Sequence, residues 1–202
     1  GHTHAGSSAV VCNVAVHVSS STAEVTGVSI ESVPTSTADE PAELIDNNPL
    51  GKIPTLITDD GITVYDSRAI MGYLDRTGAQ RIYPRNAEKR TEVDVLEALC
   101  DGICDALLLC VYEKRHRPED KFHQPWVDTQ WRKAMRGLDT LETRIPRMGK
   151  NPTAAHIAIA AVTGYLALRF DGQWERGRPK LKAYGKKFAA NYPALAPLMP
   201  SA

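Results

Sequence analysis

A proline at the entrance to a β-like run is the first feature with a chemical meaning. The sequence from Asn47 to Asp75 reads NNPLGKIPTLITDDGITVYDSRAIMGYLD, and Pro54 opens a run of β-forming residues. Proline cannot donate a ladder hydrogen bond, so it is unusual at that position. A cis Ile53–Pro54 bond in a tight bend would leave the main chain of Ile53 to pair with an extended ligand. An ordinary trans proline at a strand start is the alternative.

Two polar residues follow the second β-like run of this segment. Asp66 and Ser67 carry oxygen atoms that can cap a helix predicted at Arg68–Asp75. The amide groups and the dipole at such a helix start also suit a carboxylate ligand. Plain helix capping is the simpler interpretation of this pair alone, and ligand binding is the alternative.

The cysteine pattern predicts neither a disulfide scaffold nor a metal site. Cys12, Cys100, Cys104 and Cys110 include no CxxC pair, and the last three share one helical stretch, where cysteine acts as a small apolar residue. This usage suits a reducing compartment. The predicted location is therefore the cytoplasm.

The elements that must position these residues are of mixed type in the N-terminal part. A short first strand and a buried helix at Val10–Val18 precede an alternating apolar and polar run at Val28–Val33, which predicts a half-buried strand. The runs Pro54–Thr58 and Ile62–Tyr65 flank a tight DDG turn and predict a hairpin. The predicted order is strand, helix, strand, hairpin and helix.

Beyond a stretch rich in turn residues, the pattern becomes helical. Apolar residues recur at three- and four-residue spacing across Val93–Val111. Further helices are predicted near Val127–Arg144, Thr153–Arg169 and Pro179–Ala190. The helix at Thr153–Arg169 is apolar on nearly every side, so it should form the buried centre of a helical domain.

The composition argues against two broad classes of partner. The 202 residues carry 24 basic and 24 acidic side chains, and a net charge of zero argues against general nucleic-acid binding. No apolar run approaches the roughly 18 residues that cross a bilayer. We therefore expect neither a nucleic-acid nor a membrane partner.

The order of NPLGKIP loop, hairpin, YDS turn and helix closely resembles the glutathione-binding half of glutathione S-transferases, above all of bacterial members. Glu97–Glu113 and Thr153–Arg176 resemble the first long helix and the buried helix of the family's C-terminal half. The resemblance implies an α/β, thioredoxin-like domain at residues 1–76, a linker at 77–86 and an all-helical domain at 87–202. It also implies a homodimer.

The resemblance assigns binding roles around the proline. The main chain of Ile53, with Pro54 in cis, would pair with the cysteinyl part of glutathione, which acts as co-substrate. Lys52 is placed to reach the glycine carboxylate of the tripeptide.

At the helix start, the resemblance implies that Asp66 and Ser67 hold the γ-glutamyl end, Ser67 also through its amide. Asp101 resembles an acid that, in some classes, reaches the γ-glutamyl amine across the dimer. A solvent-facing acid on a helix is the commoner meaning of such a residue.

The group that activates the thiol is predicted from the start of the first helix. The family often reads SPFVRKV there, and this chain reads SAVVCNV from Ser8, so Ser8 falls on the serine whose hydroxyl donates to the thiolate. Ser7 is the neighbouring candidate, and helix capping alone is the alternative for both. A free thiol has a pKa of about 8.5, so a donor and a helix N-terminus are needed to favour the anion. A hydrophobic electrophile would bind around Leu108–Tyr112, facing Ser8.

Two departures from the family pattern have structural consequences. The run Ser19-Ser20-Ser21-Thr22 has low helix propensity, so the first helix is expected to be short or frayed, and a specialised sequence at this point is the alternative. His156 stands where the family usually has Asp, in a capping box with Thr153. A neutral imidazole can still accept the hydrogen bond, and the loss relative to Asp is expected to be about 1 kcal/mol.

Three functions compete. A glutathione transferase, with Ser8 orienting the thiolate, is the predicted function. A non-catalytic glutathione-binding or scaffold protein of the same fold is the second, because the first helix is divergent. A thiol-disulfide reductase or dehydroascorbate-type enzyme would need a nucleophilic cysteine at the Ser8 position, and Cys12 lies inside the helix, where burial makes it inert.

Overall fold

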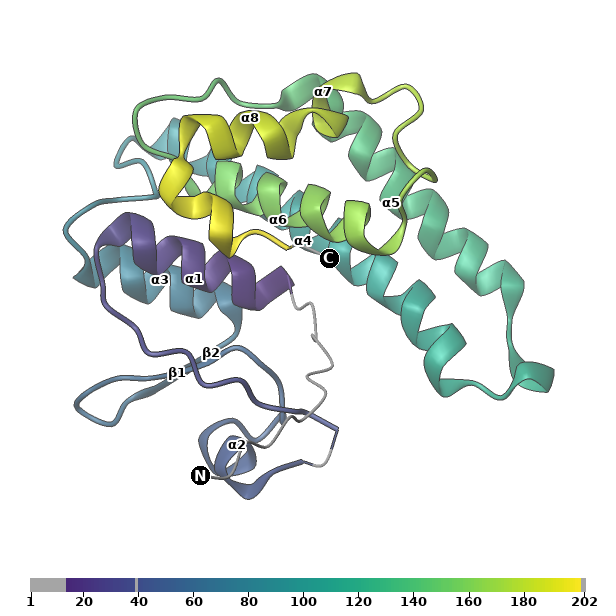
Figure 1. Ribbon diagram of the computed structural model, residues 1–202, viewed down its shortest axis with the longest axis horizontal. Helices are drawn as coiled ribbons and strands as arrows, with labels where there is room; N and C mark the ends of the chain where they lie inside the picture. Colours follow the sequence, from purple (N-terminus) through teal and green to yellow (C-terminus); the bar gives the residue numbers. More distant parts are fainter. Residues whose placement is uncertain (1–13, 39, 201–202) are drawn as a thin grey trace, which may run out of the picture.

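The computed structural model of the chain describes residues 14–38 and 40–200. These residues form a small α/β part with a two-stranded sheet and a larger helical part (Figure 1). In chain order the elements are α1 (Val14–Thr26), α2 (Ala42–Asn47), β1 (Thr55–Ile57), β2 (Thr63–Tyr65), α3 (Ser67–Thr77), α4 (Ala87–His116), η1 (Glu119–Lys121), α5 (Gln124–Arg144), α6 (Ala154–Arg169), α7 (Pro179–Lys182), α8 (Tyr184–Asn191) and η2 (Pro193–Leu198).

The sheet of the first part is the predicted hairpin. β1 and β2 are antiparallel, with Thr55 opposite Tyr65 and Ile57 opposite Thr63. The turn closes at Gly61, whose φ of +80° lies in the left-handed region that glycine enters without steric penalty. The prediction of a hairpin around the DDG turn is confirmed.

α1 and α3 lie side by side above the hairpin (Figure 1). Ala23 of α1 packs with Ile70 and Leu74 of α3 in a small buried cluster, and Leu56 and Val64 of the two strands close it from the hairpin side. α1 also contacts α6, so one helix is shared between the α/β part and the helical part.

The strand predicted at Val28–Val33 is wrong. This stretch is extended chain outside the sheet, and Ile30 and Val33 are 37% and 69% exposed. An alternating pattern gives a strand only where a neighbouring strand completes its hydrogen bonds, and no strand of the described chain pairs with this segment. The first strand expected ahead of Val10 lies outside the described residues.

The first helix also differs from the prediction, because α1 continues through the serine run to Thr26. Ser21 and Thr22 have no exposed surface. The Thr22 hydroxyl donates to the carbonyl of Val18 at 2.8 Å, and the Thr26 hydroxyl donates to that of Thr22 at 2.8 Å. These bonds satisfy the hydroxyls of Thr22 and Thr26 inside the helix, whereas the buried Ser21 hydroxyl has no hydrogen-bond partner among the described residues. Packing against α3 and α6 supplies the stability that their low helix propensity lacks.

A buried carboxylate fixes the connection between the two parts. Asp75, 4% exposed, accepts the main-chain N–H groups of Ile82 and Tyr83 at 2.7 and 3.1 Å. Its second oxygen accepts from Arg81 at 2.9 Å. The Tyr83 hydroxyl then donates to the buried carboxylate of Glu97 on α4 at 2.8 Å. Burial raises the pKa of Tyr83, so the hydroxyl keeps the proton that it donates.

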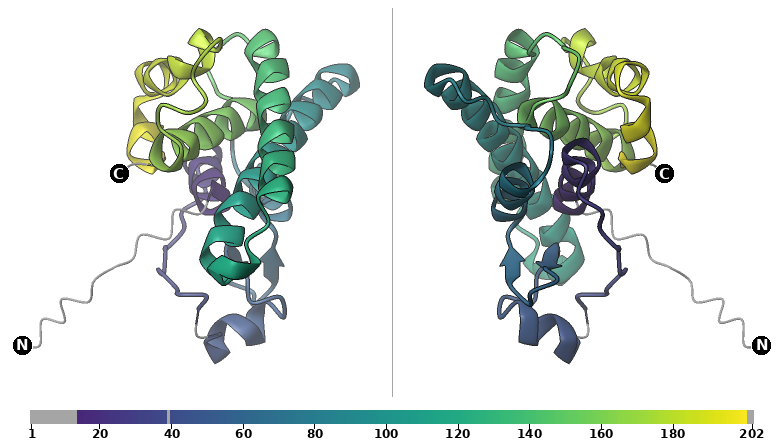
Figure 2. Two further views of the ribbon diagram at one scale, coloured as in Figure 1. Left: turned by 90° about the vertical axis from the view of Figure 1, so that its right-hand side faces the viewer. Right: turned by 90° about the vertical axis from the view of Figure 1, so that its left-hand side faces the viewer.

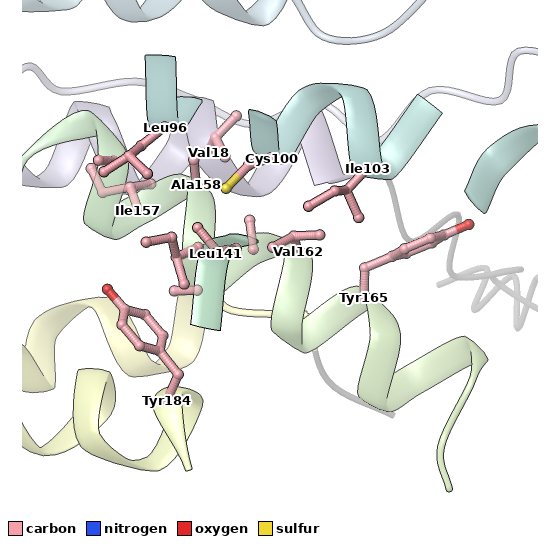
Figure 3. Packing of buried hydrophobic residues seen from close by; sticks show 14 of the residues in the cluster. Val18, Leu96, Cys100, Ile103, Leu141, Ile157, Ala158, Val162, Tyr165 and Tyr184 are labelled. Atoms are coloured by element: carbon pink, nitrogen blue, oxygen red, sulfur yellow. The ribbon is translucent and has the colours of Figure 1, made fainter. Parts of the chain in front are cut away.

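The helical part is built around α6, which is buried on nearly every side, as predicted. Figure 3 shows Ile157 and Val162 of α6 among residues from the surrounding helices, including Leu96 of α4, Leu141 of α5 and Tyr184 of α8. α4 and α5 pack as a long helical hairpin beside this core (Figure 1). None of the described helices combines the length and the apolar character needed to cross a bilayer.

Three short helices differ from the sequence-based expectation. The single helix predicted at Pro179–Ala190 is divided into α7 and α8 at Ala183, whose N–H lies near two carbonyls, those of Pro179 and Leu181. α2 was not predicted at all, because six residues are too few for a helical period to show.

A capping box with His156 in the acidic position closes the N-terminus of α6. Nδ1 of His156 accepts the main-chain N–H of Thr153 at 3.1 Å, and Nε2 lies 3.2 Å from the carbonyl oxygen of Arg147. Nε2 must carry the proton, because a carbonyl only accepts. The neutral ring therefore takes over the acceptor role of a carboxylate. Burial lowers the pKa of His156, against the raising effect of the bond to Arg147.

Acid should destabilise the protein through this histidine. Because the folded-state pKa of His156 lies below its ordinary value, the unfolded chain binds the proton more readily. The free energy of unfolding is then fully retained above about pH 6.5 and falls as the pH drops below it. His156→Asn keeps a neutral acceptor that cannot titrate, so part of this fall should vanish. Urea denaturation at a series of pH values measures the effect.

His17 makes a second contribution of the same sign. Its Nδ1 donates to the carbonyl of Leu198 at 2.7 Å, and burial lowers its pKa in the same direction. The loss of unfolding free energy at acid pH that remains in His156→Asn should therefore become smaller when His17→Gln is added. An unchanged pH dependence in both variants would contradict the assignment to these two rings.

Candidate functional site

One buried side chain, Asn48, holds the NPLGKIP loop. Asn48 is 2% exposed, and its Nδ2 donates to the carbonyl of Lys52 at 2.8 Å. Its Oδ1 accepts the N–H of Leu50 at 3.1 Å, and the Thr55 hydroxyl donates to the same Lys52 carbonyl at 3.0 Å. These bonds fix the bend that leads into β1. Sequence reasoning assigned Asn48 no role, although Asn-Pro is a turn signal that could have identified it.

The Ile53–Pro54 peptide bond is cis, as predicted. Both residues are half-buried and lie directly ahead of Thr55, the first residue of β1. Lys52 is exposed, and its ammonium has no ion-pair partner within the described chain. The loop thus places a main-chain bend next to an unpaired cation.

Asp66 and Ser67 connect β2 to α3. Asp66 adopts a φ of +59°, which is uncommon for a residue other than glycine, and its Oδ1 accepts the N–H of Arg68 at 3.0 Å. Ser67 is the first residue of α3, and its hydroxyl has no hydrogen-bond partner among the residues that the structure describes. The first amides of a helix have no intrahelical acceptor. This helix start therefore combines a capping carboxylate with unused donors.

The register of the hairpin brings these two features together. Thr55, which follows Pro54, is the Cα partner of Tyr65, which precedes Asp66. Antiparallel partners have Cα atoms about 4.5–5.5 Å apart, so the cis bend and the start of α3 lie at the same end of the hairpin. In Figure 1 the hairpin turn lies to the left, and the opposite, open end leads to α2 along one strand and to α3 along the other.

An ion pair joins this end of the hairpin to the helical part. Nε of Arg68 on α3 lies 2.6 Å from Oδ2 of Asp101 on α4, and their side chains are 58% and 28% exposed. Burial raises the pKa of Asp101, and the bond from Arg68 opposes that rise. The carboxylate is thus engaged within its own chain, and its contact with a γ-glutamyl amine stays a prediction. Sequence reasoning missed Arg68, because its partner lies 33 positions away.

One face of α4 leads from this ion pair to exposed apolar side chains. Leu108 lies two helical turns after Asp101, and Tyr112 lies three turns after Asp101. The three residues therefore share a face of α4. Leu108 and Tyr112 are 37% and 42% exposed. Leu108 and Tyr112 thus form an exposed apolar strip, and the second-substrate pocket around Leu108–Tyr112, facing Ser8, stays a prediction.

The residues predicted to act on the thiol are not placed by the structure. Ser7 and Ser8 lie outside the described residues, so their roles stay predictions. Cys12, predicted to be inert, also lies outside them. Within residues 14–38 and 40–200, no group of three or more His, Cys, Asp or Glu side chains could hold a metal ion.

Comparison with protein families supports a two-domain assignment. The family model "Glutathione S-transferase, N-terminal domain" matches residues 9–81, and "Glutathione S-transferase, C-terminal domain" matches residues 124–184. These matches confirm the predicted fold class, a thioredoxin-like N-terminal domain followed by an all-helical domain.

Individual proteins show the same similarity. The "uncharacterized GST-like protein YibF" of Escherichia coli is 38% identical over 126 residues, 60% of this chain and 62% of that protein, so the match spans less than two thirds of its length. A glutathione transferase family member from Pseudomonas fluorescens Pf-5, solved with bound glutathione, is 32% identical with a TM-score of 0.84, covering 95% of this chain and 96% of the other. A glutathione S-transferase from Methylobacillus flagellatus, also with glutathione bound, is 28% identical with a TM-score of 0.84, covering 94% and 96%.

Substitutions at Asp66 separate capping from backbone conformation. Asp66→Ala should lower the free energy of unfolding by about 2 kcal/mol, because alanine loses the cap bond and is strained at positive φ. Asp66→Gly should be less destabilising, since glycine adopts positive φ freely. Asp66→Asn keeps an oxygen acceptor and should be the mildest. Urea denaturation ranks the three variants, and equal losses for Ala and Gly would show that the backbone conformation plays no part.

Proposed function

Because this chain belongs to the glutathione S-transferase family, we propose that it is a glutathione transferase that binds the tripeptide at the open end of the hairpin and joins its sulfur to a small hydrophobic electrophile. The observation that carries the proposal is the adjacency of the cis Ile53–Pro54 bend and the Asp66–Ser67 helix start. The bound glutathione in the similar structures from Pseudomonas fluorescens and Methylobacillus flagellatus supports the same ligand here.

The proposed binding mode gives each charged group of glutathione an oppositely charged or hydrogen-bonding partner. Lys52 pairs with the glycine carboxylate, and the main chain of Ile53 pairs with the cysteinyl residue. The amide and hydroxyl of Ser67 donate to the γ-glutamyl carboxylate, and Asp66 accepts from the γ-glutamyl ammonium. Such charge-assisted hydrogen bonds are stronger than neutral ones. The unpaired state of Lys52 and of the Ser67 hydroxyl within the described chain fits these roles.

The proposed reaction requires the thiolate. The cysteinyl thiol loses its proton to solvent, and a hydrogen bond from Ser8 stabilises the anion, with Ser7 as the neighbouring candidate donor. Each unit by which the thiol pKa falls corresponds to about 1.4 kcal/mol. The sulfur electron pair attacks an electrophilic carbon, a C–S bond forms, and the leaving group departs with its electron pair. Holding the two reactants together supplies most of the remaining acceleration.

The exposed strip at Leu108 and Tyr112 supports a hydrophobic second substrate, because it lies on the face of α4 that begins at the Arg68–Asp101 ion pair. Apolar contact there would position the electrophile without a charged anchor. A reducing cytoplasm, which keeps glutathione as the thiol, is part of the same proposal.

A symmetric homodimer also belongs to the proposal. Val95 and Leu109 lie four helical turns apart on one side of α4 and are 44% and 40% exposed, a face that a second copy would cover. Sedimentation equilibrium should therefore give twice the chain mass of 22.1 kDa. A mass equal to that of the single chain would contradict the dimer and leave the glutathione site unaffected.

A glutathione-binding protein without catalysis is the second candidate. The family match begins at Ala9, directly after Ser8, so both candidate thiol-activating serines precede the matched stretch. The two functions differ in the state of the bound thiol. A transferase should show thiolate ultraviolet absorbance when glutathione binds at neutral pH, and a binding protein should not.

Ser67→Ala tests the binding site. Loss of a donor to a charged carboxylate should weaken glutathione binding at least about tenfold. The free energy of unfolding should change by less than about 0.5 kcal/mol, because the hydroxyl has no described protein partner. Isothermal titration calorimetry measures the affinity. Thr91→Ala, which removes an exposed hydroxyl near the start of α4, is the matched control and should bind as the wild type does.

Conjugation assays complete the test. The chain should accelerate the reaction of glutathione with a chloronitrobenzene, and Ser67→Ala should reduce the rate most at low glutathione concentration. Binding without conjugation would favour the second candidate. A folded chain that neither binds nor conjugates glutathione would contradict both.

A further inference from the structure

A cavity of about 240 Å³ lies between the end of α5, the loop that follows it, α7 and α8. Its lining residues are Thr143, Ile145, Pro146, Met148, Lys180, Tyr184, Lys187 and Asn191. We call it the α7–α8 cavity. Figures 1 and 2 place α7 and α8 at the end of the molecule opposite to the hairpin, so this cavity is remote from the proposed glutathione site.

The base of the α7–α8 cavity is apolar and held in place. Tyr184 is 1% exposed, its ring stacks on Phe188, and its hydroxyl donates to the carbonyl of His156 at 3.2 Å. Ile145 and Met148 are half-buried beside it. These contacts fix Tyr184 beneath the base, and the half-buried Ile145 and Met148 supply the apolar surface that a ligand can reach.

The rim is cationic. Lys180 and Lys187 are exposed, and neither ammonium has an ion-pair partner among residues 14–38 and 40–200. Glu142, which directly precedes the lining residue Thr143, uses its two carboxylate oxygens to accept the main-chain N–H groups of Lys180 and Leu181 at 3.0 and 2.9 Å. It therefore caps α7 and does not pair with either ammonium.

The surrounding chain strengthens the positive field. Residues 143–150 contain three basic and no acidic side chains, and residues 176–191 contain six basic and no acidic ones. The zero net charge of the chain hides a division: residues 1–113 hold 7 basic and 17 acidic side chains, and residues 114–202 hold 17 and 7. A hollow within the basic half attracts anions.

We propose that the α7–α8 cavity is a binding site for a small amphipathic carboxylate, with one aromatic ring or short acyl chain on the apolar base and the carboxylate between Lys180 and Lys187. Pockets for drug-sized ligands measure about 300–1,000 Å³, so this smaller cavity suits a ligand with a single ring. An apolar base with a few convergent polar groups is the usual composition of a small-molecule site. The site is independent of glutathione.

The test uses 3-phenylpropanoate as the probe and its uncharged amide as the matched control ligand, with binding to the full chain measured by calorimetry. Lys180→Gln and Lys187→Gln should each weaken binding of the carboxylate about twofold to fivefold, as expected for exposed ion pairs. The double variant, and the amide with the wild type, should bind about tenfold more weakly. Lys182→Gln and Lys186→Gln remove neighbouring exposed charges that do not line the cavity, and they should leave the affinity within about twofold.

Two further measurements locate the probe. Thr143→Trp, on the exposed rim, should fill the cavity and abolish binding, with an unchanged circular dichroism spectrum showing that the fold is retained. Saturating glutathione should not displace the probe. Absence of saturable binding, equal affinity for carboxylate and amide, equal losses in the Lys182 and Lys186 variants, or displacement by glutathione would each overturn the proposal.

Discussion

The antiparallel pairing of Thr55 with Tyr65 is the constraint on which the candidate site depends. It sets the bend before β1 beside the helix start after β2, two features that are separate in sequence and carry different chemistry. A one-residue slip in this register would turn the side chains of one strand to the opposite face. Leu56 and Val64, packed against the cluster between α1 and α3, oppose such a slip. The packing of the small domain thereby protects the geometry of the site.

The rest of the structure holds this end of the hairpin still. Asn48 fixes the loop from within, and the Arg68–Asp101 pair ties the start of α3 to α4. Asp75 accepts a main-chain N–H group of the connection between the two parts, and the Tyr83 hydroxyl in that connection donates to Glu97 on α4. Each bond involves a charged or amide side chain that is buried or half-buried. Removing the partner of such a group lowers the free energy of unfolding substantially. A site formed by loops and helix ends is thus attached to two rigid helices, as binding residues on loops generally are.

Features that depend on neighbours in sequence could be predicted, and those that depend on distant partners could not. The hairpin around DDG, the cap at Asp66 and the buried α6 follow from local turn chemistry and periodicity. Val28–Val33 was wrongly predicted as a strand, because its pattern is local but its pairing is not. The serine run in α1 was misjudged because tertiary burial outweighs helix propensity. Arg68 gave no sign of its partner on α4. Asn48 bonds only within its own loop, and its Asn-Pro turn signal was overlooked. The roles of Ser7 and Ser8 stay predictions.

The proposed function requires the bend and the helix start to act as one binding site. Titrating the isotope-labelled chain with glutathione, followed by the backbone amide resonances of Ile53 and Ser67, tests this most directly. We expect both amides to shift along a single saturable binding curve while those of α7 and α8 stay unchanged. A response at one of the two residues without the other, or saturable shifts confined to distant helices, would contradict it.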